Sequence, residues 1–206
     1  MEKEQIENYW RNNKQEFAGD RRSKIIYNLS KKYIGEKTLD VGAGSGALIR
    51  LIEGAVGIDL VENEIVSKGD VTNLRFDNFR FNTVFATEVL EHLNDENLSK
   101  SLSEIWRVLK RNGYFVLTVP YKEDLHKNMV SCPKCEFEFH RWQHIHSFSE
   151  EKIRRILYQH GFNIVEIGVK PFSLYERGWK WKLLSPIILR FHKEVSKTLF
   201  VVAKKI

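Results

Sequence analysis

Three glycines at alternate positions follow directly after a short apolar run, and this arrangement constrains the fold most. The stretch TLDVGAGSGAL covers residues 38–48 and contains Gly42, Gly44 and Gly46. A strand that runs into a glycine turn and then a helix is how α/β proteins bind nucleotide-like ligands. The sequence therefore predicts an α/β fold with a ligand pocket at this turn.

The residues around the turn narrow the choice of ligand. A triphosphate-binding loop needs a lysine after its glycines, and none is present here. The spacing G-x-G-x-G also differs from the dinucleotide fingerprint G-x-G-x-x-G. Asp59 ends the next apolar run, where its carboxylate can accept hydrogen bonds from ribose hydroxyls, and Asp70 follows where it can reach an adenine amino group. These two acids favour a nucleoside-containing ligand.

Apolar runs and helical periodicities alternate along the chain. Strands are expected at 37–41, 55–60, 83–89, 113–120, 162–169 and 197–205, and helices over most of 2–34 and at 46–52, 95–110 and 149–161. Strands that alternate with helices predict a mainly parallel sheet with helices on both faces.

Composition limits the class of protein. The chain has 206 residues, of which 42% are hydrophobic and 29% charged, as expected for one globular domain. It contains no apolar stretch of about 18 residues that would predict a transmembrane helix. The charged start of the chain does not resemble a signal peptide, and the two cysteines cannot form a disulfide framework. We therefore expect a cytoplasmic protein.

Five motifs together carry a resemblance to a known family. They are LDVGAGSGAL, GIDL, GDVTNLRF, VFATEVLEHL and EIWRVLKRNGYFVLTVP. As a set they resemble class I S-adenosylmethionine-dependent methyltransferases, in particular the group with V-L-E-H after the fourth strand. The resemblance spans roughly residues 37–168. It implies a Rossmann-like, seven-stranded, mainly parallel sheet whose last strand, here KTLFVVAKK, is antiparallel.

The resemblance also implies S-adenosylmethionine as cofactor and assigns residues to its parts. Asp40, Gly42, Gly44 and Gly46 would surround the methionine part, Asp59 would bind the ribose, Asp70 and Val71 would flank the adenine, and Ala86 and Thr87 would line the methyl end. The segment between Asp59 and Asp70 is too short for the helix that the family has there.

The chain is expected to form a single methyltransferase domain over residues 1–206. Three segments differ most from the family motifs: an N-terminal helical cap (1–34), an insert (120–148) and a substrate lid (171–196). The last segment interleaves apolar and basic residues. This composition allows a lid or core helix, contact with a lipid-like substrate or a membrane surface, or a dimer contact.

The insert contains a candidate zinc knuckle. Cys132, Cys135, His140 and His144 follow the spacing C-x₂-C-x₄-H-x₃-H, and His146 could replace either histidine. Thiolates and imidazoles at such spacing are typical ligands of structural zinc. A pair of thiols with surface histidines, or a redox pair, is the alternative.

A second candidate site follows the fourth expected strand. Glu88, Glu91 and His92 are spaced i, i+3 and i+4, so they share one face if a helical turn begins there. This E-x-x-E-H resembles the metal motif of small-RNA 3′-end 2′-O-methyltransferases and of some ubiquinone-pathway O-methyltransferases, with His146 as a further ligand. The resemblance implies a catalytic divalent metal. His92 as a metal-free general base and a purely structural role are the alternatives.

The methyl acceptor is the least determined part of the prediction. Because the sulfonium is already a strong electrophile, the protein needs mainly to align the acceptor and remove a proton. We expect a small-molecule acceptor and O-methyl transfer. The net charge of +6 also allows an RNA-directed 2′-O-methyltransferase, and a module that binds cofactor or nucleic acid without catalysis is the third alternative.

Overall fold

A seven-stranded sheet forms the centre of the computed structural model, which describes residues 19–132, 135–177, 180–181, 183–185 and 197–206. The strands are β1 (Thr38–Val41), β2 (Val56–Asp59), β3 (Val66–Lys68), β4 (Phe81–Thr87), β5 (Leu109–Pro120), β8 (Phe162–Lys170) and β9 (Thr198–Lys205). Their order is β3-β2-β1-β4-β5-β9-β8. Only β9 pairs antiparallel with its neighbours, so the predicted Rossmann-like sheet with an antiparallel last strand is confirmed.

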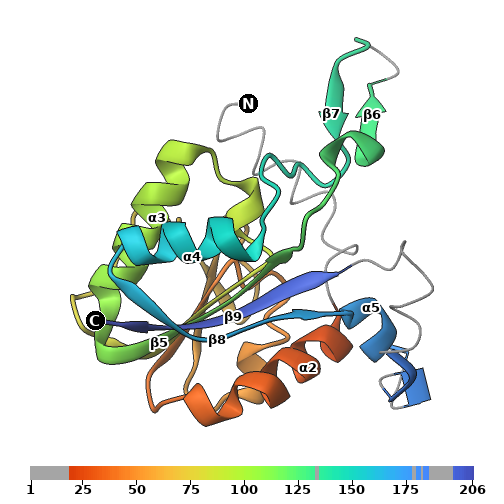
Figure 1. Ribbon diagram of the computed structural model, residues 1–206. Coiled ribbons are helices and arrows are strands. Elements are labelled where there is room, and N and C mark those ends of the chain that lie inside the picture. Colours follow the sequence, from red (N-terminus) through yellow and green to blue (C-terminus); the bar gives the residue numbers. More distant parts are fainter. Residues whose placement is uncertain (1–18, 133–134, 178–179, 182, 186–196) are drawn as a thin grey trace.

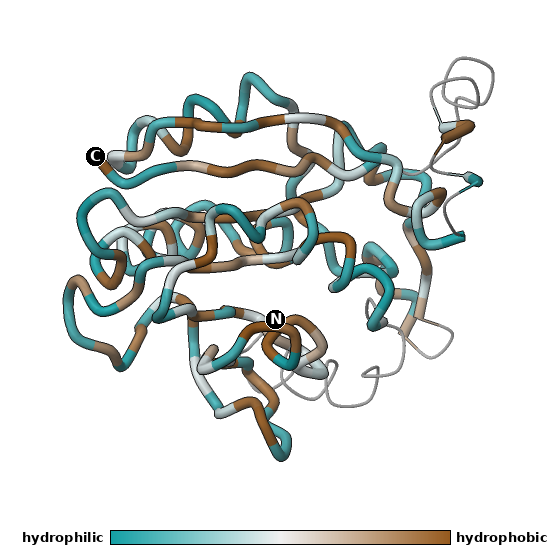
Figure 2. Tube along the Cα trace, turned by 90° about the horizontal axis from the view of Figure 1, so that it is seen from below, coloured by the Kyte–Doolittle hydropathy of each residue, from teal (hydrophilic) through white to brown (hydrophobic). Residues whose placement is uncertain are grey.

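Helices cover both faces of this sheet (Figure 1). The helices α3 (Asp95–Val108) and α4 (Glu150–Gln159) lie on one face, and α2 (Asp20–Ser30) lies on the other. Along β4, Val84 and Ala86 belong to the core under α3 and α4, whereas Phe85 belongs to the core under α2. Because successive strand residues point to opposite faces, a strand covered on both sides must be apolar throughout. Figure 2 shows hydrophobic stretches along the strands and hydrophilic outer turns.

The two main helices lie where the sequence predicts them, although each ends two residues earlier than expected. Asn94 caps α3 by accepting a hydrogen bond from the Asn97 N–H at 2.8 Å, and Ser149 caps α4 through the Lys152 N–H at 3.1 Å. Gly161, with a φ of 79°, follows the last turn of α4.

Three sequence predictions of elements are wrong in detail. The strand expected to reach residue 89 ends at Thr87, because Glu88 has a φ of 56° that no strand accommodates. The helix expected at 46–52 is a single 3₁₀ turn, η3 (Ile49–Leu51), since Gly46 has a φ of 76° and cannot belong to a helix. The strand β3 was expected to be a loop, because three residues are too few to show a periodicity.

The segments that differ from the family motifs are partly described. The N-terminal cap includes α2 and the 3₁₀ helix η2 (Lys31–Tyr33); residues 1–18 lie outside the described residues. The insert contains η5 (Leu125–Asn128) and a hairpin of β6 (Met129–Ser131) and β7 (Glu138–His140) that stands away from the main sheet (Figure 1).

The expected substrate lid is described only in part. It begins with the short helix α5 (Phe172–Tyr175), while residues 178–179, 182 and 186–196 lie outside the described residues. Its expected role, including contact with lipid or a membrane, therefore stays a prediction. Within the described part of the chain, no helix is long and apolar enough to cross a membrane.

Candidate functional site

A pocket of about 1550 Å³ lies where β1, β2, β4 and β5 end. Parallel strands place their carboxyl ends at one edge of a sheet, and ligands of such folds bind in the crevice outside that edge. The glycine turn follows β1, Asp59 ends β2, a 3₁₀ turn η4 (Leu90–His92) follows β4, and the insert follows β5.

The glycine turn keeps the chain close to β2. The N–H groups of Gly42 and Ala43 both donate to the carbonyl of Ile58, at 2.9 and 3.0 Å. Gly42 has a φ of 71°, and a Cβ at this position would collide with the side chain of Val89. Only glycine permits both the left-handed backbone and this close approach.

Asp59 is fixed by the backbone at the edge of the pocket. One carboxylate oxygen accepts a hydrogen bond from the Gly44 N–H at 2.9 Å, and the other accepts from the Val61 N–H at 3.0 Å. The first bond ties the end of β2 to the glycine turn, and the second is a local bond within the turn after β2. They hold a carboxylate at the place where the sequence predicts ribose binding.

Asp40 is a buried acid at the floor of the pocket. Its side chain is 2% exposed, and its Oδ1 has no hydrogen-bond partner among the described residues. Burial, and then the charge of Asp59, raise the pKa of Asp40 to about 8. This site therefore favours a cationic ligand group or a proton beside Asp40.

Most of the residues predicted to bind the cofactor meet at this pocket. Those that line it are Asp40, Gly42, Gly44, Asp59, Asp70, Val71 and Thr87. Asp70 is held by Thr72, whose N–H and hydroxyl donate to its Oδ1 at 2.9 and 2.7 Å. Gly46 and Ala86 are not among the lining residues, and Ala86 is fully buried inside β4.

The expected common face of Glu88, Glu91 and His92 is wrong for the first of these residues. Glu88 has left-handed backbone and precedes the 3₁₀ turn that carries the other two. Its carboxylate lies 3.7 Å from the guanidinium of Arg22. Glu91 and His92 instead approach His144 from the insert.

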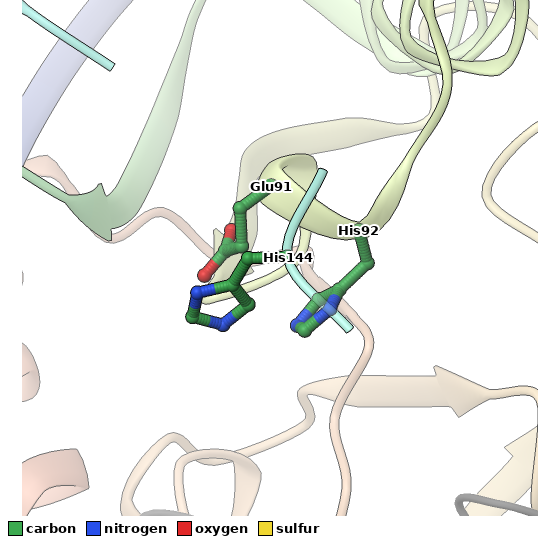
Figure 3. Close-up of side chains that lie close together, drawn as sticks. All are labelled: Glu91, His92 and His144. Atoms are coloured by element: carbon green, nitrogen blue, oxygen red, sulfur yellow. The ribbon is translucent and has the colours of Figure 1, made fainter. Parts of the chain in front are cut away.

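Glu91, His92 and His144 form a cluster beside the pocket (Figure 3). One potential ligand atom from each of the three lies within 4.8 Å of the others. The rings of His92 and His144 are 4.8 Å apart between centroids. Glu91 is fully buried, and neither carboxylate oxygen has a hydrogen-bond partner in the described part of the chain.

Burial determines the protonation of this cluster. Desolvation, and then the charge of Glu88, raise the pKa of Glu91 well above its usual value. Desolvation, and then the neighbouring His144, lower the pKa of His92 to about 3, so its imidazole is neutral. The Nδ1 of His92 lies 3.4 Å from the carbonyl oxygen of Gln143, which only accepts, so the lone pair is on Nε2.

The structure brings together the histidines of the predicted zinc knuckle but not its cysteines. His140 and His144 lie next to Glu123. Cys132 lies opposite Phe137, three positions along the hairpin from the pair that Met129 and His140 form. Among the described residues, no group of three potential ligands contains a cysteine. The knuckle stays a prediction, since residues 133–134 lie outside the described residues.

Two residues with clear roles in the site have no sequence motif, and one predicted ligand lies elsewhere. Arg22 comes from α2 to pair with Glu88, and Glu123 contacts two histidines. Only the position of Glu123, three residues after β5 ends, could have indicated it. His146, expected as a further ligand, lies 3.5 Å from Asp95 at the start of α3.

Comparisons with known proteins identify the family and the fold of the chain. The family model of the methyltransferase domain matches residues 3–167. An uncharacterised protein of Methanocaldococcus jannaschii is 35% identical over 94 residues, which cover 41% of this chain and only 37% of that protein.

Several solved structures have a similar fold. One is the 1,6-didemethyltoxoflavin-N1-methyltransferase of Burkholderia thailandensis with bound S-adenosylhomocysteine. It matches with a TM-score of 0.66 at 18% identity, over 98% of this chain and 86% of that one. A cyclase, SpnF, has a TM-score of 0.61 at 16% identity, over 90% of this chain and 80% of that one. Together, the family match, the fold and the pocket show that the chain belongs to the class I S-adenosylmethionine-dependent methyltransferases.

Proposed function

We propose that the protein transfers a methyl group from S-adenosylmethionine to a hydroxyl oxygen of a small molecule. The observation that carries this proposal is that one pocket contains both the glycine turn with Asp59 and a group of histidines. The glycine turn and Asp59 lie on one side, and His92 and His144 lie on the other. Pockets for one small ligand usually measure about 300–1,000 Å³. A volume of about 1550 Å³ therefore supports a cofactor and a small acceptor together.

The reaction asks little of the chain beyond alignment and proton removal. The acceptor oxygen forms a bond to the methyl carbon while the bond from that carbon to the sulfonium sulfur breaks. S-adenosylhomocysteine leaves, and the hydroxyl proton must pass to a base. The polar groups at the acceptor end of the pocket are the candidates for this second task.

We further propose that Glu91, His92 and His144 hold a divalent metal ion. The donor set fits, because Glu91 offers a buried carboxylate and the imidazoles of His92 and His144 stand beside it. One carboxylate with two imidazoles suits zinc, manganese and iron. Bound there, the ion would lower the pKa of an acceptor hydroxyl. This set replaces Glu88 and His146 of the sequence prediction with His144.

The alternative of His92 as a metal-free general base is less well supported. A general base works best when its pKa lies near the working pH, and the pKa of His92 is about 3. An imidazole that resists protonation so strongly is better suited to donate its lone pair to a metal ion than to accept a proton.

Labelled cofactor tests the proposed acceptor. The full chain is incubated with methyl-labelled S-adenosylmethionine and a cell extract separated into small molecules and RNA. We expect label in a small molecule as a methyl ether, unaffected by nuclease. Label in a nuclease-sensitive fraction would instead support the RNA-directed alternative. Cofactor binding without transfer to any fraction would support the non-catalytic module.

Chelation and metal analysis test the proposed ion. Full chelation should abolish transfer, and manganese, magnesium or cobalt should restore it. Glu91→Gln should lose the metal response, whereas Glu88→Gln, whose carboxylate lies outside the cluster, should keep it. Elemental analysis of protein purified without chelator separately tests the predicted zinc knuckle: zinc should be present and lost in Cys132→Ser. Unchanged turnover after full chelation contradicts the catalytic ion.

A further inference from the structure

Glu123 stands between two histidines that come from the other end of the insert. Its side chain is 16% exposed. One carboxylate oxygen lies 2.5 Å from Nδ1 of His144, and the other lies 3.5 Å from Nε2 of His140. Asn128 donates to the second oxygen at 3.1 Å. Two hydrogen bonds, from His144 and Asn128, therefore hold this carboxylate in place, and His140 lies beside it.

The backbone decides the protonation pattern of His140. The N–H of His144 donates to Nδ1 of His140 at 3.1 Å, so this nitrogen carries a lone pair. A neutral imidazole has one protonated nitrogen, which here must be Nε2. That N–H faces Glu123. In this metal-free arrangement, His140 turns the N–H of Nε2 toward the carboxylate.

Glu123 in turn decides the protonation pattern of His144. An ionised carboxylate only accepts hydrogen bonds, so Nδ1 of His144 must carry the hydrogen across the 2.5 Å contact. In the neutral ring, the remaining nitrogen of His144, Nε2, then has the lone pair.

We propose that Glu123 is the positioning residue of the metal site, which fixes His144 in the tautomer that offers Nε2 as a ligand atom. The inference rests on the proposed metal site of Glu91, His92 and His144. Carboxylates that accept the second N–H of a ligating histidine orient the ring and strengthen it as a donor. The peptide carbonyl of Gln143 does the same for His92, at 3.4 Å.

This arrangement explains why the insert folds back onto the site. Glu123 precedes η5, Asn128 ends it, and His140 ends β7. Asn128 and His140 each contribute one contact to the carboxylate of Glu123. The backbone N–H groups of Ile145 and His146 also donate to the carbonyl of Glu91, at 2.8 and 3.2 Å. The contacts at Glu123 and at the carbonyl of Glu91 thus hold His144 of the insert next to the turn after β4.

Metal affinity measures the proposed role without a reaction. Manganese binding to the full chain is followed by calorimetry in the absence of cofactor and acceptor. Loss of such a carboxylate typically weakens metal binding by about 10–100-fold, and we expect this for Glu123→Ala. We expect a smaller loss for Glu123→Gln, whose amide oxygen can still accept the hydrogen bond. Glu138→Ala, an exposed acid on β7, is the matched control and should bind manganese as wild type does.

A spectroscopic readout separates this inference from the metal proposal. Nitrogen-15 spectra of the imidazole rings without metal should show His144 as the Nδ1–H tautomer in wild type and a mixture in Glu123→Ala. S-adenosylhomocysteine binding should be the same in all variants that fold. If wild type binds manganese and Glu123→Ala binds it within twofold, the positioning role is refuted. If wild type binds no divalent ion, the metal site is refuted, and so is the role of Glu123 in positioning a metal ligand. The spectra then still show whether Glu123 determines the tautomer of His144.

If Glu123→Ala does not fold, Glu123→Gln and Asn128→Ala can still refute the inference. Asn128 touches the carboxylate but neither imidazole in the contacts described above. Its loss should weaken manganese binding less than the loss of Glu123. Wild-type affinity and an unchanged tautomer in both variants would overturn the inference.

Discussion

Replacing Asp40 with asparagine should stabilise the cofactor-free protein and at the same time weaken its binding of S-adenosylmethionine. Asp40 lines the pocket but is only 2% exposed. Its Oδ1 has no hydrogen-bond partner among the described residues. Burial and the nearby Asp59 raise its pKa from 3.8 to about 8. The charged form is thus unfavourable in the empty pocket.

The pH dependence of this effect has a definite sign. Between pH 4 and pH 8, roughly, the folded protein keeps the Asp40 proton that the unfolded chain has lost. The folded state then binds more protons, so the free energy of unfolding falls as pH rises through this window. From the ordinary pKa of an aspartate up to pH 7 is about three pH units, and each unit lowers the free energy of unfolding by about 1.4 kcal/mol. The total loss at pH 7 is therefore about 4 kcal/mol.

Asparagine removes the ionisation but adds an N–H₂ group to a buried position. An unsatisfied buried donor costs about 1–3 kcal/mol. The net gain for Asp40→Asn is therefore about 1–3 kcal/mol in the free energy of unfolding at pH 7. Near pH 4 the ionisation of Asp40 no longer contributes, so only the cost of the buried donor remains and Asp40→Asn should be about 1–3 kcal/mol less stable than wild type.

Cofactor binding should change in the opposite direction. The methionine part of S-adenosylmethionine carries an ammonium and lies beside the positively charged sulfonium. A carboxylate at Asp40 can compensate these charges, and an amide cannot. Hydrogen bonds to charged groups contribute about 1.5–3 kcal/mol, so Asp40→Asn should bind the cofactor at least about tenfold more weakly.

Thermal unfolding at pH 4.5, 7 and 8, with and without cofactor, measures both the change in stability and the change in cofactor binding. The exposed Asp77 provides the control, because Asp77→Asn should change stability by less than about 0.5 kcal/mol. If Asp40→Asn is less stable than wild type by the same amount at every pH, the buried charge is not the cause. Unchanged cofactor affinity would remove Asp40 from the binding site.

Three further substitutions test other parts of the structure. Asp59→Ala should weaken cofactor binding in calorimetry by about 1.5–3 kcal/mol, and an unchanged dissociation constant would contradict its role. Gly42→Ala forces a side chain into left-handed backbone and against Val89; it should cost about 1–3 kcal/mol of stability in denaturant unfolding, and a neutral result would refute the strain. Lys205→Met removes hydrogen bonds of 2.6 and 2.8 Å to the carbonyls of Trp106 and Leu109, so the unfolding free energy should fall by about 1.5–3 kcal/mol; no change in Tm would contradict this.

The sheet could be predicted because its strands are covered on both faces. Such strands must be apolar throughout, and runs such as the one that forms β5 are visible without any alignment. The antiparallel β9 and the number of strands came from the family resemblance, since no local pattern specifies strand direction. The three residues of β3 are held by pairing with β2 rather than by a periodicity of their own.

The meeting of the glycine turn and Asp59 at one pocket could be predicted for a physical reason. The N–H of Gly44 donates to the Asp59 carboxylate over only 15 positions, so the local sequence encodes this geometry. Glu91 and His144 are far apart in sequence and meet only because the insert folds back. The left-handed backbone of Glu88 was also hidden, because the pattern E-x-x-E-H reads as a regular helical turn.

The fold alone does not fix the reaction, because the same architecture is shared with a cyclase. The reaction depends instead on the residues at the pocket, where the insert completes a polar cluster with Glu91 and His92. A buried Glu91 without a hydrogen-bond partner in the described residues destabilises the protein unless a proton or a cation compensates it. Two imidazoles oriented with Nδ1–H groups turned to other acceptors would not supply that proton. A proton taken up from solvent, which the raised pKa of Glu91 favours, or the divalent ion proposed above would meet this condition.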